Sequence, residues 1–170
     1  MSETPPEPGR VVGIDLGRRR VGVAVSDDRG RVATPHAVLA RSGDDAADRK
    51  ALVAVVRALG AGRVVVGLPL SLDGSTGPAA RGASEEAAAL AALVDVPVDL
   101  HDERLTTVAV LRSPRPERRR RATRRAPVDS QAAAVMLQSW LDRRQAGTVP
   151  PASAPEPPAG EAPAKGGTDR

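Results

Sequence analysis

The sequence contains no cysteine, phenylalanine or tyrosine, and Trp140 is its single aromatic residue. The absence of cysteine excludes disulfides, thiolate zinc sites and cysteine nucleophiles. One aromatic ring cannot provide the series of stacking platforms on which many proteins bind single-stranded nucleic acid. The core must therefore be built from Val, Leu, Ile and Ala, and any contact with nucleic acid must rely on phosphates.

Long hydrophobic runs are also missing. Charged residues interrupt every apolar stretch before it reaches the roughly 20 residues that span a bilayer, and the N-terminal residues lack the apolar run of a secretory signal. We therefore expect a cytoplasmic protein with no membrane partner. Residues 1–9 and 146–170 are rich in Pro and have no apolar periodicity, so we expect two disordered tails around one domain at residues 10–145.

Hydrophobic periodicity indicates an α/β protein. Apolar runs bounded by turn residues predict five strands, at residues 11–16, 21–25, 32–39, 63–68 and 96–100. Apolar residues at helical spacing predict four helices, one capped by residues 42–45 and ended by Gly60, the others at residues 78–93, 106–111 and 129–144. Three antiparallel strands followed by parallel additions, with helices on both faces, is the ribonuclease H-like order with a five-stranded mixed sheet.

Two features place individual strands within that sheet. Pro35 suits an edge position for the third strand, because proline cannot donate to a neighbouring strand. The run at 64–68 is apolar throughout, as in a strand buried on both faces, so the fourth strand should be at or near the centre.

The loop that follows, at 69–77, contains glycines and should be flexible. We expect changes in this loop to alter substrate placement more than folding.

Three acidic residues lie beside the ends of predicted elements: Asp15, Glu103 and Asp129. A trio of carboxylates that converge on one point is what magnesium-dependent phosphodiester hydrolysis needs. Each residue also has a plainer interpretation. Asp15 could be an exposed strand residue, Glu103 could form an ion pair with Arg104 or Arg20, and Asp129 could be the N-cap of the last helix.

The neighbours of these acids refine the choice. Gly13 and Gly17 lie two residues to either side of Asp15 and leave room for a ligand or another backbone. The five-residue motif at 13–17, Gly-Ile-Asp-Leu-Gly, also occurs near the start of ATPases of the actin and sugar-kinase type. These ATPases need two such domains, and this chain is too short to contain both. His101 is expected to be a structural or surface residue, because a magnesium site with oxygen ligands needs no imidazole.

Positive charge is concentrated in one segment. Residues 112–125 contain eight arginines against Glu117 alone. Such a block is typical of a polyanion-binding surface, although a solvated loop has the same composition. The side chains that we expect to hold backbone phosphates are Arg20, Arg118, Arg119, Arg120, Arg121, Arg124 and Arg125.

Four motifs in this order resemble the YqgF family of pre-16S ribosomal RNA nucleases, whose members are also described as Holliday junction resolvases. The motifs are Gly13-Ile-Asp-Leu-Gly-x-x-Arg-x-Gly-Val-Ala-Val-Ser-Asp27, Val66-Gly-Leu-Pro-x-x-x-x-Gly74, Asp102-Glu-Arg-Leu-Thr-Thr107 and Val128-Asp-x-x-Ala-Ala133. The resemblance implies a ribonuclease H-like fold, with the nuclease site at Asp15, Glu103 and Asp129. It also implies Mg²⁺, or alternatively Mn²⁺, as the metal that these three residues bind.

The resemblance further implies a role in forming the 5′ end of small-subunit ribosomal RNA, so nucleic acid is the expected partner and pre-rRNA the expected substrate. Two alternatives stay open. A resolvase would act on branched DNA and would need a symmetric dimer to place two sites on a four-way junction, whereas an RNA nuclease could be a monomer or a homodimer. A non-catalytic RNA-binding assembly factor would keep the fold without the activity.

Overall fold

The computed structural model describes residues 9–105 and 127–147. The predicted short helix at 106–111, the arginines at 118–125 and most of both predicted tails lie outside the described residues. Within the described parts, no helix is both long enough and apolar enough to span a bilayer.

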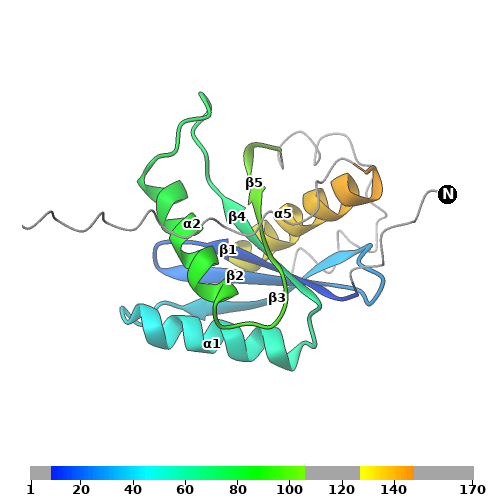
Figure 1. Ribbon diagram of the computed structural model, residues 1–170, viewed down its shortest axis with the longest axis horizontal. Coiled ribbons are helices and arrows are strands. Elements are labelled where there is room, and N and C mark those ends of the chain that lie inside the picture. The colour runs from blue at the N-terminus through cyan, green and yellow to red at the C-terminus, as the bar shows by residue number, and fades with distance from the viewer. Residues whose placement is uncertain (1–8, 106–126, 148–170) are drawn as a thin grey trace, which may run out of the picture.

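Five strands form one mixed sheet in the order β3-β2-β1-β4-β5 (Figure 1). The strands are β1 (Val11–Leu16), β2 (Arg20–Ser26), β3 (Ala33–Ala40), β4 (Arg63–Leu68) and β5 (Val98–Asp102). β1 pairs antiparallel with β2, which pairs antiparallel with β3, while β4 pairs parallel with both β1 and β5. The predicted antiparallel meander with two parallel additions is therefore confirmed, and β1 is the central strand.

Local chemistry explains the turns of the meander. Gly17 N donates to Arg20 O at 2.9 Å, and a Cβ on Gly17 would lie 2.5 Å from the same oxygen, so this tight turn requires glycine. At the other edge of β2, the register with β3 shifts between Val23 and Ala24. Pro35 lies on β3 at this bulge, on an edge strand as predicted.

Three helices complete the described structure: α1 (Asp45–Ala58), α2 (Pro78–Ala91) and α5 (Val128–Gln145). α1 and α2 cover one face of the sheet and α5 covers the other (Figure 1). The Asp44 side chain caps α1 by accepting from Ala46 N and Ala47 N, as the sequence predicted.

Two element boundaries differ from the prediction. β5 begins at Val98 rather than Val96, because its pairing with β4 starts at Val98 opposite Val64 and runs on to Asp102. α5 begins at Val128, with Pro127 as its N-cap. The interpretation of Asp129 as the N-cap is therefore wrong, since this residue already lies inside the first turn of the helix.

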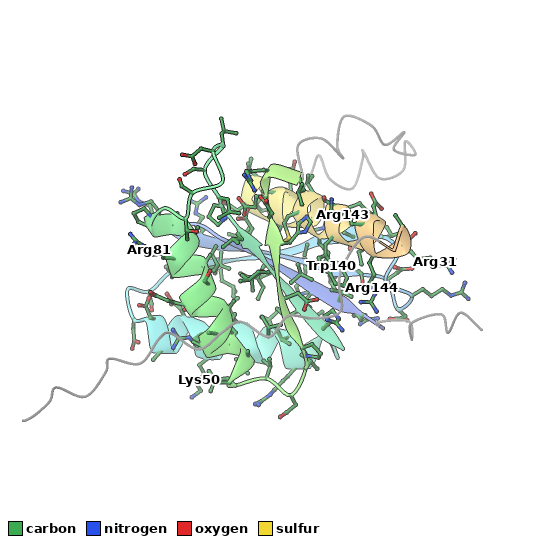
Figure 2. The ribbon with its side chains drawn as sticks, turned by 45° about the horizontal axis from the view of Figure 1, so that its top comes forward. Arg31, Lys50, Arg81, Trp140, Arg143 and Arg144 are labelled. Carbon is green, nitrogen blue, oxygen red and sulfur yellow. The ribbon has the colours of Figure 1, made fainter. Side chains whose placement is uncertain are left out.

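The core on the α5 face is built around the single aromatic side chain. Trp140 is 1% exposed and packs with Val11 and Val65 of the sheet. The guanidinium of Arg144 lies 5.5 Å from the centroid of the Trp140 ring. Figure 2 shows the two side chains together on the C-terminal half of α5. A Cβ on Gly13 would lie 2.8 Å from Leu137 Cβ, so glycine at this position lets α5 approach the sheet closely.

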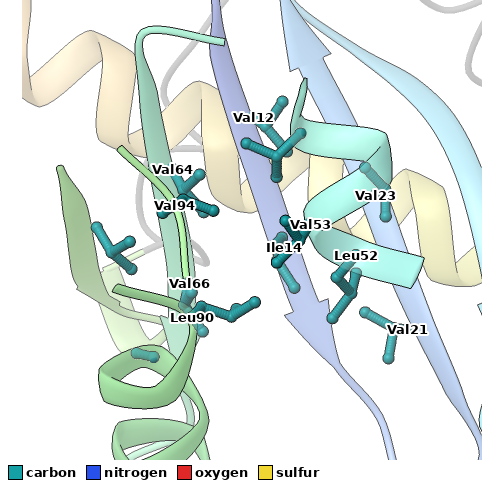
Figure 3. Close-up of a cluster of buried hydrophobic side chains, with 13 residues drawn as sticks. Val12, Ile14, Val21, Val23, Leu52, Val53, Val64, Val66, Leu90 and Val94 are labelled. Atoms are coloured by element: carbon teal, nitrogen blue, oxygen red, sulfur yellow. The ribbon is translucent and has the colours of Figure 1, made fainter. Parts of the chain in front are cut away.

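The core on the opposite face is aliphatic. Val12 and Ile14 of β1 point into it, where they meet Leu52 and Val53 of α1 and Leu90 of α2 (Figure 3). Because side chains alternate along a strand, Val11, Gly13 and Asp15 belong to the α5 face. Asp15 therefore points to the side of the sheet that α5 covers.

Candidate nuclease site

The three predicted acids come from three elements that meet at one end of the sheet. Asp15 lies near the C-terminal end of β1, opposite Gly22 of β2. Glu103 directly follows β5, and its backbone N donates to Leu68 O at the end of β4 at 3.1 Å. Asp129 lies in the first turn of α5.

Asp15 and Glu103 are in direct contact. A hydrogen bond between their side chains favours the protonated form of Glu103 and the ionised form of Asp15. Burial, followed by the nearby charge of Asp15, raises the pKa of Glu103 to about 7. The pKa of Asp15 is also raised, first by burial and then by the negative charge of Asp129. The pair therefore holds a proton at pH values where isolated carboxylic acids are ionised.

Two glycines make room for these acids. A Cβ at Gly67 would overlap the carboxylate oxygen Oε1 of Glu103, and a Cβ at Gly22 would overlap the backbone oxygen of Asp129. The Glu103 side chain thus lies over β4, while the start of α5 lies directly on β2. Both glycines are part of the motifs found in the sequence, but their role depends on which strands lie side by side and could not be assigned before the register was known.

Asp129 is held differently from the other two acids. Its Oδ2 lies 3.6 Å from Nη1 of Arg20, and both side chains are largely exposed. Asp129 is near enough to Asp15 to raise its pKa. Arg20, which the sequence suggested as a phosphate contact, therefore lies at the edge of the acid cluster, where it balances part of the negative charge.

The plainer interpretation of Glu103 as half of an ion pair is wrong. Arg104 pairs instead with Asp102, with Nη2 2.6 Å from Oδ2, and Arg20 pairs with Asp129. The Asp102 carboxylate is therefore occupied by Arg104. Of the two adjacent acids only Glu103 faces Asp15, as strand alternation predicted.

His101 is a structural residue, as expected. It is 4% exposed on the α5 face, and its Nε2 lies 3.2 Å from Ser139 Oγ. Burial, followed by the positive charge of Arg143, lowers the pKa of His101 to about 4. The imidazole is therefore neutral at physiological pH and takes no part in the acid cluster.

The donor chemistry of the cluster fits a hard divalent cation. Asp15 and Glu103 are neighbouring carboxylates whose pKa values are raised by burial and then by a nearby negative charge, that of Asp129 for Asp15 and that of Asp15 for Glu103. A bound cation would relieve this repulsion. Within residues 9–105 and 127–147, however, no three acidic or histidine side chains are already placed to hold a metal ion. The predicted triad is thus a close pair with Asp129 beside it, turned toward Arg20.

Comparison with known proteins identifies the family. The family model described as "RuvX: Holliday junction resolvase" matches residues 9–143. The chain belongs to the RuvX family. RuvX relatives in Mycobacterium sp. (strain KMS) and Pelotomaculum thermopropionicum, both named "Putative pre-16S rRNA nuclease", are 46% and 40% identical to this chain. The matches cover 88% of this chain and 89% of the first relative, and 87% of this chain and 99% of the second. The resemblance to the YqgF nucleases is confirmed.

Solved structures with this fold include two resolvases. "T. thermophilus RuvC in complex with Holliday junction substrate" is similar with a TM-score of 0.61 and 16% identity, over 82% of this chain and 97% of that one. The yeast mitochondrial Holliday junction resolvase Ydc2 gives a TM-score of 0.50 and 12% identity, over 86% and 84%. These similarities confirm the ribonuclease H-like fold of this RuvX family member. Nucleases and resolvases of this fold generally depend on a divalent metal.

Proposed function

We propose that this chain is a metal-dependent nuclease that hydrolyses phosphodiester bonds, with Asp15, Glu103 and Asp129 as its metal-binding and catalytic residues. The observation that carries the proposal is the approach of the Asp15 and Glu103 carboxyl groups, from the ends of β1 and β5, on the α5 face of the sheet. Two carboxylates from different elements, brought into contact at the end of a sheet, cost folding free energy unless a ligand uses them. Membership of a nuclease family supplies the reaction class.

Mg²⁺, or Mn²⁺ as the alternative, would be held by Asp15 and Glu103, with Asp129 as the third carboxylate. When bound, a divalent metal of this kind supplies an activated water and neutralises charge on the attacked phosphate. Glu103 must give up its proton before it can act as a ligand. Arg20 lies close enough to Asp129 to exchange that carboxylate for a substrate phosphate, which would keep the local charge balanced.

The substrate that we propose is the precursor of small-subunit ribosomal RNA, in the cytoplasm, because the curated relatives with 40% or more identity are named for it. Backbone phosphates would be bound by Arg20 together with the arginines at 118–125, which lie outside the described residues. Branched DNA is the second candidate, favoured by the description of the family model. A resolvase would work as a symmetric dimer, whereas RNA cleavage is open to a monomer as well.

The test is cleavage of two labelled substrates, a small-subunit rRNA precursor and a four-way DNA junction, with and without Mg²⁺. Three proteins are compared: wild type, Asp15→Asn, and Asp28→Asn as a matched control. Asp28 lies in the turn after β2 and pairs with Arg10, well away from the acid cluster. We expect Mg²⁺-dependent RNA cleavage by the wild type and the control, and none by Asp15→Asn.

Each other outcome has a definite meaning. Junction cleavage without RNA cleavage would make the protein a resolvase. Binding of RNA without cleavage of either substrate would contradict the nuclease proposal and favour an assembly factor. Cleavage that survives in Asp15→Asn would place the catalytic site elsewhere in the chain.

A further inference from the structure

Exposed apolar side chains occur on three segments that adjoin the acid cluster in the chain or in the sheet. The described residues have four large hydrophobic side chains with substantial exposure: Leu72 at 97%, Val128 at 78%, Leu93 at 48% and Leu105 at 36%. Val128 directly precedes Asp129, Leu105 follows Glu103 by two residues, and Leu72 lies on the loop after β4, the strand over which Glu103 lies. Leu93 alone lies elsewhere, beyond the C-terminal end of α2. Single exposed leucines are common on proteins, so the place of these side chains, on segments that adjoin the proposed site, is the point of interest.

The loop that carries Leu72 has a defined shape. It extends beyond the end of the sheet between β4 and α2 (Figure 1). Gly74 N donates to Ser71 O at 2.8 Å, and Ser71 N donates to Ser75 O at 3.2 Å, which closes the loop on itself. Gly74 has φ +84°, a conformation that favours glycine. Leu72 is held at the tip, with its side chain in solvent.

The base of this loop is tied to the acid cluster. Arg104 Nη1 donates to Ser71 O at 3.4 Å, while the Nε and Nη2 of the same guanidinium donate to the Asp102 carboxylate. Glu103 lies between these two residues in the chain, and its backbone N donates to Leu68 O where the loop begins. These two hydrogen bonds hold the base of the Leu72 loop against the segment that carries Glu103.

No aromatic side chain is available to contact a base. Trp140 is 1% exposed and lies in the core, with the guanidinium groups of Arg63 and Arg144 5.9 and 5.5 Å from the centroid of its ring. Aliphatic side chains can also insert between bases, and leucine is among those that do so in nucleic-acid-binding proteins. An exposed leucine on a loop whose base is held by Arg104 supplies an apolar contact that the sequence alone, with its emphasis on phosphates, did not predict.

We propose that Leu72 packs against an unstacked nucleobase of the substrate and so determines which phosphate reaches Asp15 and Glu103. This inference rests on the proposed nuclease function and adds a specificity determinant to it. The ligand chemistry is an unpaired or displaced base, which an RNA precursor and the branch point of a DNA junction can both present. Burial of about half of a leucine side chain against a base corresponds to roughly a tenfold gain in affinity.

The experiment uses 2-aminopurine, whose fluorescence rises when it leaves the base stack, placed at successive positions along an rRNA precursor and along one strand of a four-way DNA junction. Binding is measured with Asp15→Asn, so that the substrate stays intact, alone and combined with Leu72→Ser, Leu72→Met or Leu93→Ser. Leu72 is almost fully exposed, so Leu72→Ser should leave folding unchanged; Leu93→Ser is the matched control for loss of an exposed leucine. Cleavage positions are mapped with the same changes in an otherwise wild-type chain.

We expect one or two adjacent positions to brighten on binding, and this signal to vanish with Leu72→Ser together with about a tenfold loss of affinity and a spread of cleavage positions. Leu72→Met and Leu93→Ser should behave like the parent protein. The arm that brightens identifies whether the base belongs to RNA or to the junction. If Leu72→Ser leaves the fluorescence rise, the affinity and the cleavage positions unchanged, this inference is overturned. Cleavage by the wild type would still support the nuclease proposal in that case. Absence of binding to both nucleic acids would overturn both.

Discussion

Glu103 lies over Gly67, so closely that a single methyl group on residue 67 would overlap the Oε1 atom of the glutamate. Gly67 is on β4 and Glu103 follows β5, the neighbouring parallel strand. The lack of a side chain at residue 67 thus lets a carboxylate from the next strand reach back across the sheet toward Asp15. The glycine therefore positions the carboxylate that we propose as a metal ligand.

Gly67→Ala should therefore lower activity more than stability. The added methyl group meets the end of a flexible side chain, which can turn away, so Glu103 would be displaced while the strands stay paired. A displacement of about 1 Å at a catalytic group can cost on the order of 100-fold in rate. Steady-state kcat/KM and the Tm of each variant measure the two effects. Gly82→Ala on α2, where an added Cβ meets nothing within 4 Å, is the control and should keep full activity.

Gly22→Ala, in contrast, should lower the stability of the protein more than its activity. Here the added methyl group would overlap the backbone oxygen of Asp129, which cannot rotate away, so the first turn of α5 must move off β2. Overpacking of this kind costs about 1–3 kcal/mol. Urea unfolding should show this loss for Gly22→Ala and a smaller one for Gly67→Ala. Equal stability of Gly22→Ala and the wild type would mean that α5 does not depend on this close approach.

The stability of the metal-free protein should depend on Glu103 in a definite direction. Because the folded protein raises the pKa of Glu103 from 4.5 to about 7, the stabilising effect of its proton is complete below pH 4.5 and is lost as the pH rises through 7. The free energy of unfolding, measured at pH 5 and pH 8 for wild type and Glu103→Gln, isolates this contribution. We expect the wild type to lose more stability than the variant between the two pH values. Added Mg²⁺ should restore wild-type stability at pH 8 and have less effect at pH 5.

Arg63 and Asp99 offer a test of the packing under α5. Their ion pair, at 2.7 Å, is nearly buried, with 15% and 8% of the two side chains exposed. The second carboxylate oxygen of Asp99, Oδ1, is buried without a hydrogen-bond partner among the described residues. Arg63→Met should cost about 3–5 kcal/mol, because it leaves a buried charge unpaired. The double variant with Asp99→Val should recover most of that loss in urea unfolding, and failure to recover it would assign the loss to the contact between Arg63 and Trp140 instead.

Much of the fold followed from hydrophobic periodicity. The apolar run at 64–68 predicted β4 at its observed bounds, and the turn residues after Leu16 predicted the β1–β2 hairpin. The predicted bounds of β5 were wrong by two residues. Val96 and Pro97 are apolar like the strand itself, so the sequence could not exclude them, but the pairing with β4 begins at Val98 and continues to Asp102. Likewise, a helix start at Asp129 fits local cap preference, but Pro127 takes that place.

The sequence could single out the candidate acids but not their arrangement. Asp15, Glu103 and Asp129 could be singled out because each acid adjoins an apolar element. The approach of Glu103 to Asp15, and of Asp129 to Arg20, depends on distances between segments that are remote in the sequence. The room that Gly22 and Gly67 leave for the acids could not be predicted for the same reason. The effect of a missing side chain depends on which residues lie next to it in space.

The order of the elements along the chain also determines when the site can exist during synthesis. Asp15 is made early, but Asp129 and the helix that covers Val11 and Val65 are made after every strand of the sheet. A chain still emerging from the ribosome therefore exposes the α5 face of its sheet and has only two of the three acids. Under the proposed function, the third metal-binding acid arrives with the last helix, so an unfinished copy of this protein would lack a complete site for cutting the RNA of the ribosome that is making it.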